Sequence, residues 1–335
     1  MGGRSSSQLP PPPAGREGWP WTAGACRSAF AVRDGAVLPR ISIVTPSFNQ
    51  AQYLEETIRS VLLQGYPNLE YIIVDGGSTD GSIEIIRKYE PWLTHWESEP
   101  DRGQAHAINK GFARAHGELI TFQNSDDYYL PGALLHAADL FAGNPSAGLV
   151  VGSFRSIGVD GSQSDVTGPV YPWKTPVDLR LVPPGAWRLH QVSALFARDV
   201  LDQAGRHLRE DLRFALDREL LFRVVRLAPP ILADRCYAHF RLHDASKSVS
   251  AGLPFAEEMA SLYWDGVDPS ACKRRRASWR AVMAGGHLRS ARLAGRRGLA
   301  ARHLVSAAIL RPDCLLTRDF MRRVARATLG TRSDF

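Results

Sequence analysis

The sequence has little cysteine and no long apolar run. Its four cysteines lie far apart and form no CxxC pair, so neither a zinc site nor a disulfide framework is indicated. No stretch reaches the roughly 18 uninterrupted apolar residues of a transmembrane helix, and no charged-then-apolar leader opens the chain. We therefore expect a cytoplasmic protein, either soluble or peripheral at the inner face of the membrane.

The composition excludes a disordered chain, because 44% of the 335 residues are hydrophobic and 22% are charged. The net charge is +7, and most of the basic excess follows Lys273. This Arg-rich region is interpreted either as a surface attracted to anionic membranes or as a solvated helical tail or dimer interface. Nucleic-acid binding is disfavoured, because the basic excess lies outside the part of the chain that carries the motifs described below.

Three regions are distinguished by composition. Residues 1–38 are rich in Ser, Pro and Gly, which predicts a flexible arm, although the aromatic cluster Trp19–Trp21 could dock against the fold. Residues 39–252 alternate between apolar runs and polar segments. Residues 253–335 are rich in Ala and Arg, which predicts a helical C-terminal extension.

Short apolar runs between helical patterns predict the fold of the middle region. The runs "ISIVTPS", "EYIIVDGGS", "ELITFQNSDD" and "AGLVVGS" each end in polar residues or glycine, as buried strands do. Helical spacing recurs between them, as in Leu54, Ile58, Val61 and Leu62. The order β-α-β-α-β-α-β over residues 41–152 predicts an α/β domain with a doubly wound, mostly parallel central sheet and flanking helices.

Ligands of such folds bind at the carboxyl ends of the strands. Three polar segments should therefore meet at one edge of the sheet: Thr45, Pro46 and Ser47; Asp75, Gly76 and Gly77; and Ser125, Asp126 and Asp127.

Asp126 and Asp127 have two interpretations. They could cap a helix that Pro131 begins, or they could hold Mg²⁺ or Mn²⁺, which bind one or two carboxylates and complete their shell with water and substrate phosphates. Asp75 favours the second, because a carboxylate suits a base N–H or a ribose hydroxyl and its neighbouring glycines allow close approach. The pattern indicates a nucleotide base near Asp75 and a metal-neutralised diphosphate near Asp127.

Six motifs in order carry a resemblance to a known family. "IVTPSFNQ", "VDGGSTDGS", "SEPDRGQAHAINKGF", "NSDD", "ALDRELLFRVV" and "FRLHDASKS" together resemble the family 2 glycosyltransferases with the GT-A fold, over about residues 39–250. The resemblance implies an inverting, metal-dependent enzyme of surface polysaccharide or glycoconjugate biosynthesis. Its donor would be a nucleotide-sugar, with a UDP-sugar favoured, and its acceptor a saccharide or a lipid-linked sugar.

The resemblance also implies roles for residues of the donor site. Asp127 would coordinate Mg²⁺ or Mn²⁺, and Asp126, beside Ser125, would contact the ribose or the donor sugar. The nucleotide would be held by Thr45, Pro46, Asp75 and Gly76, although many relatives carry an acid where this chain has Gly76. Arg102 would lie near the nucleotide, and a surface salt bridge is the alternative for this residue.

The remaining implied residues serve the reaction itself. Asp217 matches the family's catalytic acid position and would be the general base, with Leu216 standing where Glu is expected. Glu219 is a close competitor and Asp211 a weaker one, and the alternative is a helix surface paired with nearby arginines. Arg241 and His243 would act on the leaving diphosphate, and His190 and Gln191 would line the acceptor side.

Two other functions compete with glycosyl transfer. A nucleotidyltransferase would need a Gly-rich, basic loop after the first strand, and "TPSFNQAQY" contains none. A non-catalytic sugar-nucleotide-binding or carbohydrate-binding protein would need neither Asp217 nor the carboxylate pair. A processive synthase of the family is disfavoured because the sequence has no membrane span and no QxxRW motif.

Overall fold

The computed structural model describes residues 9–22, 38–158, 160–179, 186–243, 246–247 and 252–262, with four further pairs of residues between 283 and 307. The described residues fall into two compact units. The first draws on Met1–Val177, Trp187–Asp211 and Leu220–Arg241, and the second on Asp178–Ala186, Leu212–Glu219 and Leu242–Phe335. Most of the basic region after Lys273, with its predicted membrane contact, lies outside the described residues.

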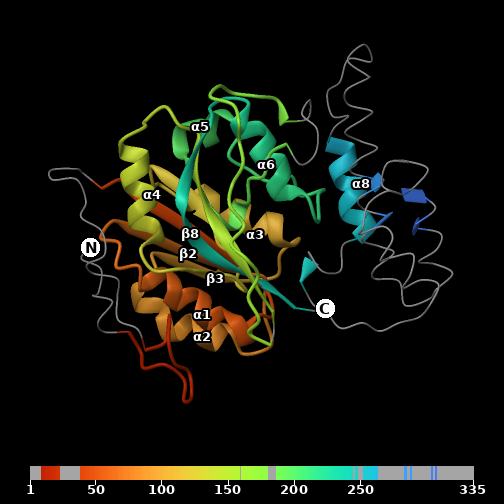
Figure 1. Cartoon of the computed structure of the whole chain (residues 1–335). Helices are drawn as coiled ribbons and strands as arrows, with labels where there is room; N and C mark the ends of the chain where they lie inside the picture. Colours follow the sequence, from red (N-terminus) through yellow and green to blue (C-terminus); the bar gives the residue numbers. More distant parts are fainter. Residues whose placement is uncertain are drawn as a thin grey trace, which may run out of the picture. The chain divides into compact units, whose positions relative to one another are not determined.

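The first unit contains an eight-stranded sheet with the order β3-β2-β1-β4-β7-β6-β8-β5 (Figure 1). Its strands are β1 (Ile41–Ser47), β2 (Leu69–Asp75), β3 (His95–Ser98), β4 (Leu119–Phe122), β5 (Tyr128–Tyr129), β6 (Leu149–Gly158), β7 (Ala194–Ala197) and β8 (Pro230–Leu242). The helices of this unit are α1 (Ala51–Leu62), α2 (Ser82–Tyr89), α3 (Gln104–Arg114), α4 (Ala133–Ala142) and α5 (Arg198–Gln203). Helix α6 (Leu216–Val225) has residues in both units, and α8 (Gly252–Leu262) belongs to the second.

One half of the sheet is parallel, as the sequence predicts. Strands β3, β2, β1 and β4 all run in the same direction, and the register pairs Ser47 with Asp75 and Asp75 with Ser98. The polar segments after β1 and β2 therefore begin at the same edge. Strand β3 was not predicted, because its four residues, HWES, contain no apolar run.

The other half is antiparallel in every pair whose direction the register fixes. The run "AGLVVGS" forms the start of β6, which pairs antiparallel with β7, and β7 pairs antiparallel with β4. Strand β5 pairs antiparallel with the long strand β8 through Tyr128 and His239. This pairing brings the end of β8 to the segment that follows β4, although about 110 residues separate them in the chain.

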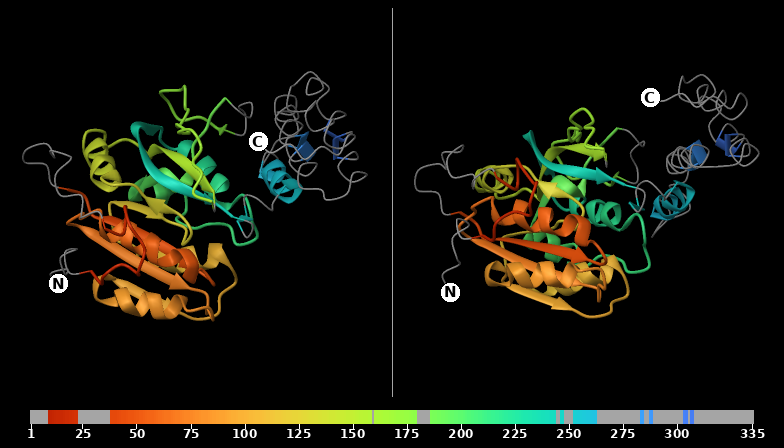
Figure 2. Two further views of the ribbon diagram at one scale, coloured as in Figure 1. Left: turned by 60° about the horizontal axis from the view of Figure 1, so that its bottom comes forward. Right: turned by 90° about the horizontal axis from the view of Figure 1, so that it is seen from below.

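Helices cover both faces of the sheet (Figures 1 and 2). On one face, buried residues of α1 and α4, among them Leu54, Ile58 and Leu134, share one hydrophobic cluster with Ile43 of β1 and Tyr71 of β2. On the opposite face, the rings of Phe112 in α3 and Phe122 in β4 lie 6.2 Å apart. Helix α4 begins at Ala133, two residues beyond the predicted start at Pro131.

The predicted flexible arm is corrected for residues 9–22, the first stretch of the chain that the structure describes. Trp21 is 7% exposed, and Leu9 packs against the hydrophobic core. The buried guanidinium of Arg59 in α1 donates to the carbonyl oxygens of Pro10 and Trp21 at 2.7 and 3.1 Å. Of the two alternatives that the sequence left open, docking is therefore the one observed.

Candidate functional site

Asp75 stands at the end of β2 and is fully buried. Its Oδ2 accepts hydrogen bonds from the backbone N–H of Ser78 (2.8 Å) and Gly77 (3.1 Å) and from the Ser98 hydroxyl (2.7 Å), and its Oδ1 accepts one from the Ser78 hydroxyl (2.6 Å). A carboxylate has about four lone-pair positions, so protein donors already use its capacity. The geometry makes Asp75 the residue that shapes the following loop.

Two glycines in that loop have different structural reasons. Gly77 has a φ of 83°, which favours glycine. Gly76 provides space, because a Cβ there would lie 2.9 Å from Oδ2 of Asp101 and 3.3 Å from the ring of Phe48. The Phe48 ring is 60% exposed, and Asp101 is partly exposed. An aromatic face and a carboxylate therefore lie side by side over Gly76.

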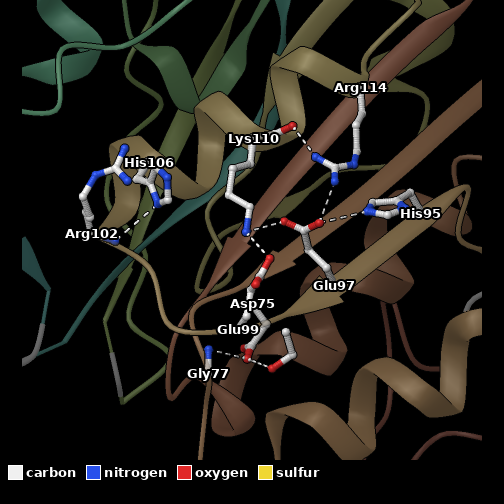
Figure 3. A network of polar contacts seen from close by, with 10 residues as sticks. Asp75, Gly77, His95, Glu97, Glu99, Arg102, His106, Lys110 and Arg114 are labelled. Atoms are coloured by element: carbon white, nitrogen blue, oxygen red, sulfur yellow. Dashed lines mark hydrogen bonds and ion pairs between the residues drawn. The ribbon is translucent and has the colours of Figure 1, made fainter.

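A salt-bridge network fixes the loop that carries Asp101 and Arg102 (Figure 3). Glu97 in β3 contacts Lys110 at 2.6 Å and Arg114 at 2.9 Å, both in α3, and His95 at 3.3 Å. Burial alone would raise the pKa of Glu97, but the hydrogen bonds from Lys110 and His95 and the charge of Arg114 leave it below its ordinary value. Since β3 and α3 flank the loop, the network holds both of its ends.

Arg102 forms the surface salt bridge that was its alternative interpretation. Its guanidinium contacts Glu210 at 2.8 Å, and its side chain is 68% exposed. Hydrogen bonding to Arg102 holds the pKa of Glu210 below its ordinary value, against a raising effect of burial. The salt bridge with Glu210 leaves the Arg102 side chain exposed. The role of Arg102 near a nucleotide stays a prediction.

The segment with the two adjacent carboxylates is tied to α1 and β8. The Thr57 hydroxyl donates to the backbone oxygens of Ser125 (2.9 Å) and Asp127 (2.6 Å). The Arg241 side chain donates through Nε to the backbone oxygen of Asp126 (2.9 Å) and forms an ion pair with Glu56 (2.9 Å). The arrangement excludes the helix-cap interpretation, because strand β5 follows directly and α4 begins only at Ala133.

The two carboxylates differ in exposure. Asp127 is fully buried, and its oxygens accept from the Arg241 backbone N–H (2.8 Å) and from Asn124 Nδ2 (3.2 Å). Burial, and next the charge of Asp126, raise the pKa of Asp127 well above its ordinary value, against the opposing hydrogen bonds. Asp126 is partly exposed. The accessible carboxylate of the pair is therefore Asp126.

The residues at this edge fit a hard divalent cation only if water and phosphate oxygens supply most of its ligands. Within the described ranges, no group of three or more His, Cys, Asp or Glu residues could enclose a metal. Two adjacent carboxylates instead suit an ion whose remaining positions are filled by water and phosphate oxygens. The buried side-chain polar atoms of Ser47 and Gln123, at the ends of β1 and β4, also have no hydrogen-bond partner among the described residues. Such atoms are costly unless a bound molecule or water satisfies them.

Other predicted donor-site residues are present at this edge but are covered. Thr45 is fully buried and its hydroxyl lies 3.1 Å from that of Tyr71, while Pro46 is buried within β1.

On the predicted acceptor side, His190 lies against the ring of Phe154, with centroids 4.5 Å apart. Gln191 is 4% exposed and donates to the backbone oxygen of Phe122.

The proposed base, Asp217, belongs to the second unit. Asp217 lies in the first turn of α6, and burial raises the pKa of its carboxyl above the ordinary value, against the nearby charge of Arg218. Its competitor Glu219 is in the same turn. His243 is buried, and its backbone N–H donates to the Ser246 hydroxyl at 3.0 Å.

A residue of α8 organises the start of α6. The Glu258 carboxylate accepts hydrogen bonds from three successive backbone N–H groups, those of Arg213 (2.9 Å), Phe214 (2.7 Å) and Ala215 (2.9 Å). These groups immediately precede the helix, where N–H groups lack intrahelical partners. The sequence did not reveal this role, since about 40 residues separate Glu258 from the donors.

Comparison with known proteins decides the family. The model of "Glycosyl transferase family 2" matches residues 42–205. A Mycobacterium tuberculosis protein described as an uncharacterized glycosyltransferase is 31% identical over 199 residues, which cover 58% of this chain and 71% of the relative. The chain belongs to glycosyl transferase family 2. It is a glycosyltransferase, as its sequence motifs predict.

Solved structures confirm the GT-A fold of this family 2 enzyme. The mannosyltransferase PcManGT from Pyrobaculum calidifontis, in complex with GDP-Man and Mn²⁺, has a TM-score of 0.54 at 20% identity, over 88% of this chain and 89% of that one. TarS 1–349 from S. aureus, in complex with UDP-GlcNAc, has a TM-score of 0.51 at 17% identity, over 88% and 93%. Among the described helices of this glycosyltransferase, none has both the length and the apolarity to cross a membrane.

Proposed function

We propose that this glycosyltransferase transfers a sugar, with inversion and with the help of Mg²⁺ or Mn²⁺, from a nucleotide-sugar to a saccharide or lipid-linked acceptor in surface polysaccharide or glycoconjugate assembly. One observation carries the proposal: the adjacent carboxylates Asp126 and Asp127, one accessible and one buried, held beside Arg241 at the carboxyl edge of the sheet. A carboxylate pair beside a fixed guanidinium suits a metal-bound diphosphate.

The nucleoside is assigned to the space over Gly76. The exposed ring of Phe48 can pack against the face of a base, and the Asp101 carboxylate beside it can accept hydrogen bonds from a base or ribose. Asp75 serves this site indirectly, since its four protein donors fix the loop. Neither Phe48 nor Asp101 was singled out from the sequence.

The metal is assigned to the carboxylate pair, with a division of roles that follows exposure. Asp126, being partly exposed, would provide the open ligand position, and buried Asp127 would support it through its contacts with Arg241 and Asn124. This exchanges the roles that the resemblance implied for the two residues. Bound there, the cation would neutralise charge on the leaving diphosphate.

The general base is assigned to Asp217. Direct displacement at the anomeric carbon needs one group that accepts the proton of the attacking hydroxyl and needs no enzyme nucleophile. A carboxylate whose pKa is raised by burial is a stronger base than an ordinary one. Glu219, two residues further on, is the alternative position for the same function.

A group of aromatic rings supports a saccharide acceptor, and the ligands of structural relatives support a nucleotide-sugar donor. The partly exposed rings of His190 and Phe240 both lie against the buried ring of Phe154, with centroids 4.5 and 6.1 Å from it, and they suit the apolar face of a sugar. The structural relatives bind GDP-Man or UDP-GlcNAc, and a UDP-sugar is the first donor to test. The Arg-rich region after Lys273 is proposed to contact anionic membrane, where a lipid-linked acceptor would reside.

Donor hydrolysis by the purified full chain tests the proposal. UDP-, GDP- and dTDP-sugars are compared in Mn²⁺, in Mg²⁺ and in EDTA, and we expect hydrolysis of one donor that EDTA abolishes. Asp126→Asn should raise the dissociation constant for Mn²⁺ more than Asp127→Asn, whereas Asp127→Asn should lower Tm more. Full activity in EDTA would remove the metal from the mechanism, and donor binding without hydrolysis or transfer would favour the non-catalytic alternative.

A further inference from the structure

The N-terminal segment of residues 9–22 is bound by one arginine. The Arg59 side chain in α1 is 4% exposed. Its Nη1 donates to the Pro10 oxygen (2.7 Å), its Nε to the Pro20 oxygen (3.1 Å) and its Nη2 to the Trp21 oxygen (3.1 Å). One guanidinium therefore holds both ends of the segment, which closes into a loop over α1 (dark red in Figure 2).

The contacts match what a buried guanidinium requires. Arginine has five N–H donors in a rigid fork, and its burial is tolerated only when acceptors surround it. Three of those acceptors are carbonyl oxygens of the segment, and Tyr89 Oη is a fourth at 3.1 Å. The Arg59 guanidinium carbon also lies 5.6 Å from the centre of the Trp21 ring. Arg59 thus depends on the segment as much as the segment depends on Arg59.

The segment also reaches the strand that follows the carboxylate pair. Trp19 Nε1 donates to the backbone oxygen of Tyr129 at 2.7 Å. The backbone N–H of Tyr129 in turn donates to the Ser60 hydroxyl at 3.1 Å, and Ser60 is the neighbour of Arg59 in α1. Tyr129 is two residues beyond Asp127, whose backbone oxygen accepts from Thr57 in the same helix.

We infer that residues 9–22 form an N-terminal brace that positions the Asp126–Asp127 pair, with Arg59 and Trp19 as positioning residues. The brace holds α1 and β5 from outside, and α1 and β5 hold the carboxylate segment between them. It lies before residues 42–205, the part of the chain that the family model matches. The inference rests on the proposed function only where it concerns metal affinity.

Three variants of the full chain test the brace. Trp19→Phe removes the Nε1 donor and keeps an aromatic ring, and Arg59→Lys keeps the charge but loses the fork. Arg223→Lys is the matched control, because Arg223 also donates to three backbone oxygens, those of Ala204, Gly205 and His207, in another part of the first unit. All three should lower Tm.

Two measurements separate positioning from simple stabilisation. Without metal or donor, Trp19→Phe and Arg59→Lys should speed hydrogen exchange at the N–H of Asp127 and Tyr129 by about three- to tenfold, the equilibrium effect of one lost hydrogen bond. Mn²⁺ affinity, followed by the spectrum of the free ion, should fall by a similar factor. Arg223→Lys should change neither quantity.

The outcomes are distinct. Unchanged exchange and Mn²⁺ affinity in both variants, with Tm lowered as in the control, would reduce the brace to a stabilising element and overturn the inference. Failure of the wild-type enzyme to hydrolyse any nucleotide-sugar would count against the proposed function. It would leave the exchange result standing, because that measurement uses neither donor nor metal.

Discussion

The backbone N–H of Arg241 donates to Oδ1 of Asp127 across 2.8 Å, joining the last residues of β8 to the segment after β4. The same arginine uses its side chain to hold the Asp126 oxygen and Glu56, and its guanidinium lies 4.6 Å from the centre of the Tyr53 ring. A single residue therefore contacts the carboxylate pair through both its backbone and its side chain.

Arg241→Lys should raise the KM for donor by about tenfold, with a smaller effect on Tm. The backbone contact to Asp127 and the positive charge remain, but the side-chain bonds to Asp126 and Glu56 lose their fixed geometry, and a total weakening of about 1.4 kcal/mol corresponds to the tenfold change. Steady-state kinetics and thermal unfolding measure the two effects. Arg235→Lys, an exposed position on the same strand, is the control, and an equal change there would contradict the prediction.

Gly76→Ala should weaken donor binding without unfolding the protein. The added methyl group would lie 2.9 Å from Oδ2 of Asp101, and this flexible carboxylate can move away, which displaces the group proposed to contact the nucleoside. We expect the dissociation constant for UDP or GDP to rise by about three- to tenfold in calorimetry. Asp101→Asn should show a loss of similar size, and the double variant should lose little more than either single one. Additive losses would show that Gly76 and Asp101 act separately.

The pH dependence of transfer should report the raised pKa of Asp217. A carboxylate base works only when it is deprotonated, so kcat/KM should fall as the pH drops through the folded-state pKa, at a value above the ordinary range for Asp. Arg218 opposes the shift, and Arg218→Gln should therefore move the acid limb to higher pH. Asp217→Asn should lower kcat by about 10²–10⁴-fold. Near-normal turnover in Asp217→Asn, together with loss in Glu219→Gln, would transfer the role to Glu219.

Glu258→Gln should lower kcat by about tenfold and leave donor affinity unchanged. The amide has one acceptor oxygen, which can keep the two bonds from Phe214 and Ala215, but its N–H₂ group then faces the N–H of Arg213, and the lost bond loosens the start of the helix that carries Asp217. Glu257→Gln is the matched control, because Glu257 is its exposed neighbour. An effect on donor affinity equal to that on kcat would argue against positioning of the base.

Acid should weaken the fold through Glu70, which is 2% exposed. It accepts from Arg40 (2.8 Å), the His116 backbone N–H (2.7 Å) and the Ser42 hydroxyl. Burial raises its pKa, but these contacts outweigh burial and leave the pKa below the ordinary value. The stabilisation is therefore present above the ordinary carboxyl pKa and is lost as the pH falls through the folded-state pKa.

Glu70→Gln should accordingly lower the free energy of unfolding at neutral pH by about 1–3 kcal/mol and flatten the acid side of the stability profile. Denaturant unfolding between neutral pH and about pH 3 measures both effects. Glu118→Gln, beside the same Arg40 but exposed, should cost less. A profile as steep in Glu70→Gln as in the wild type would assign the acid sensitivity to other carboxylates.

The sequence predicts best where its signal is local. Continuous apolar runs indicate β1, β2 and β4, because strands buried on both faces need apolar residues at every position. The carboxyl-edge rule then brings Asp75 and Asp127 to one region. Strand β3 could not be predicted in this way, because it has no continuous apolar run and its residue Glu97 forms ion pairs with α3. The order of the strands beyond β4 could not be predicted either, because antiparallel pairing between strands joined by long loops leaves no local pattern in the sequence.

By itself, then, the sequence determined the family, because its motifs resemble those of the family, and the parallel half of the sheet, because continuous apolar runs mark buried strands. Only the tertiary structure decided which residues of the proposed donor site are accessible and which already have protein partners. Four protein donors saturate the Asp75 carboxylate and burial covers Asp127, whereas Asp126 and Phe48 stay accessible. Two long-range contacts could not be predicted from local patterns: Arg241 with the carboxylate pair, and Arg59 with the N-terminal brace. The acceptors that a buried guanidinium finds depend on the packing of the whole unit, because they come from residues far away in the chain.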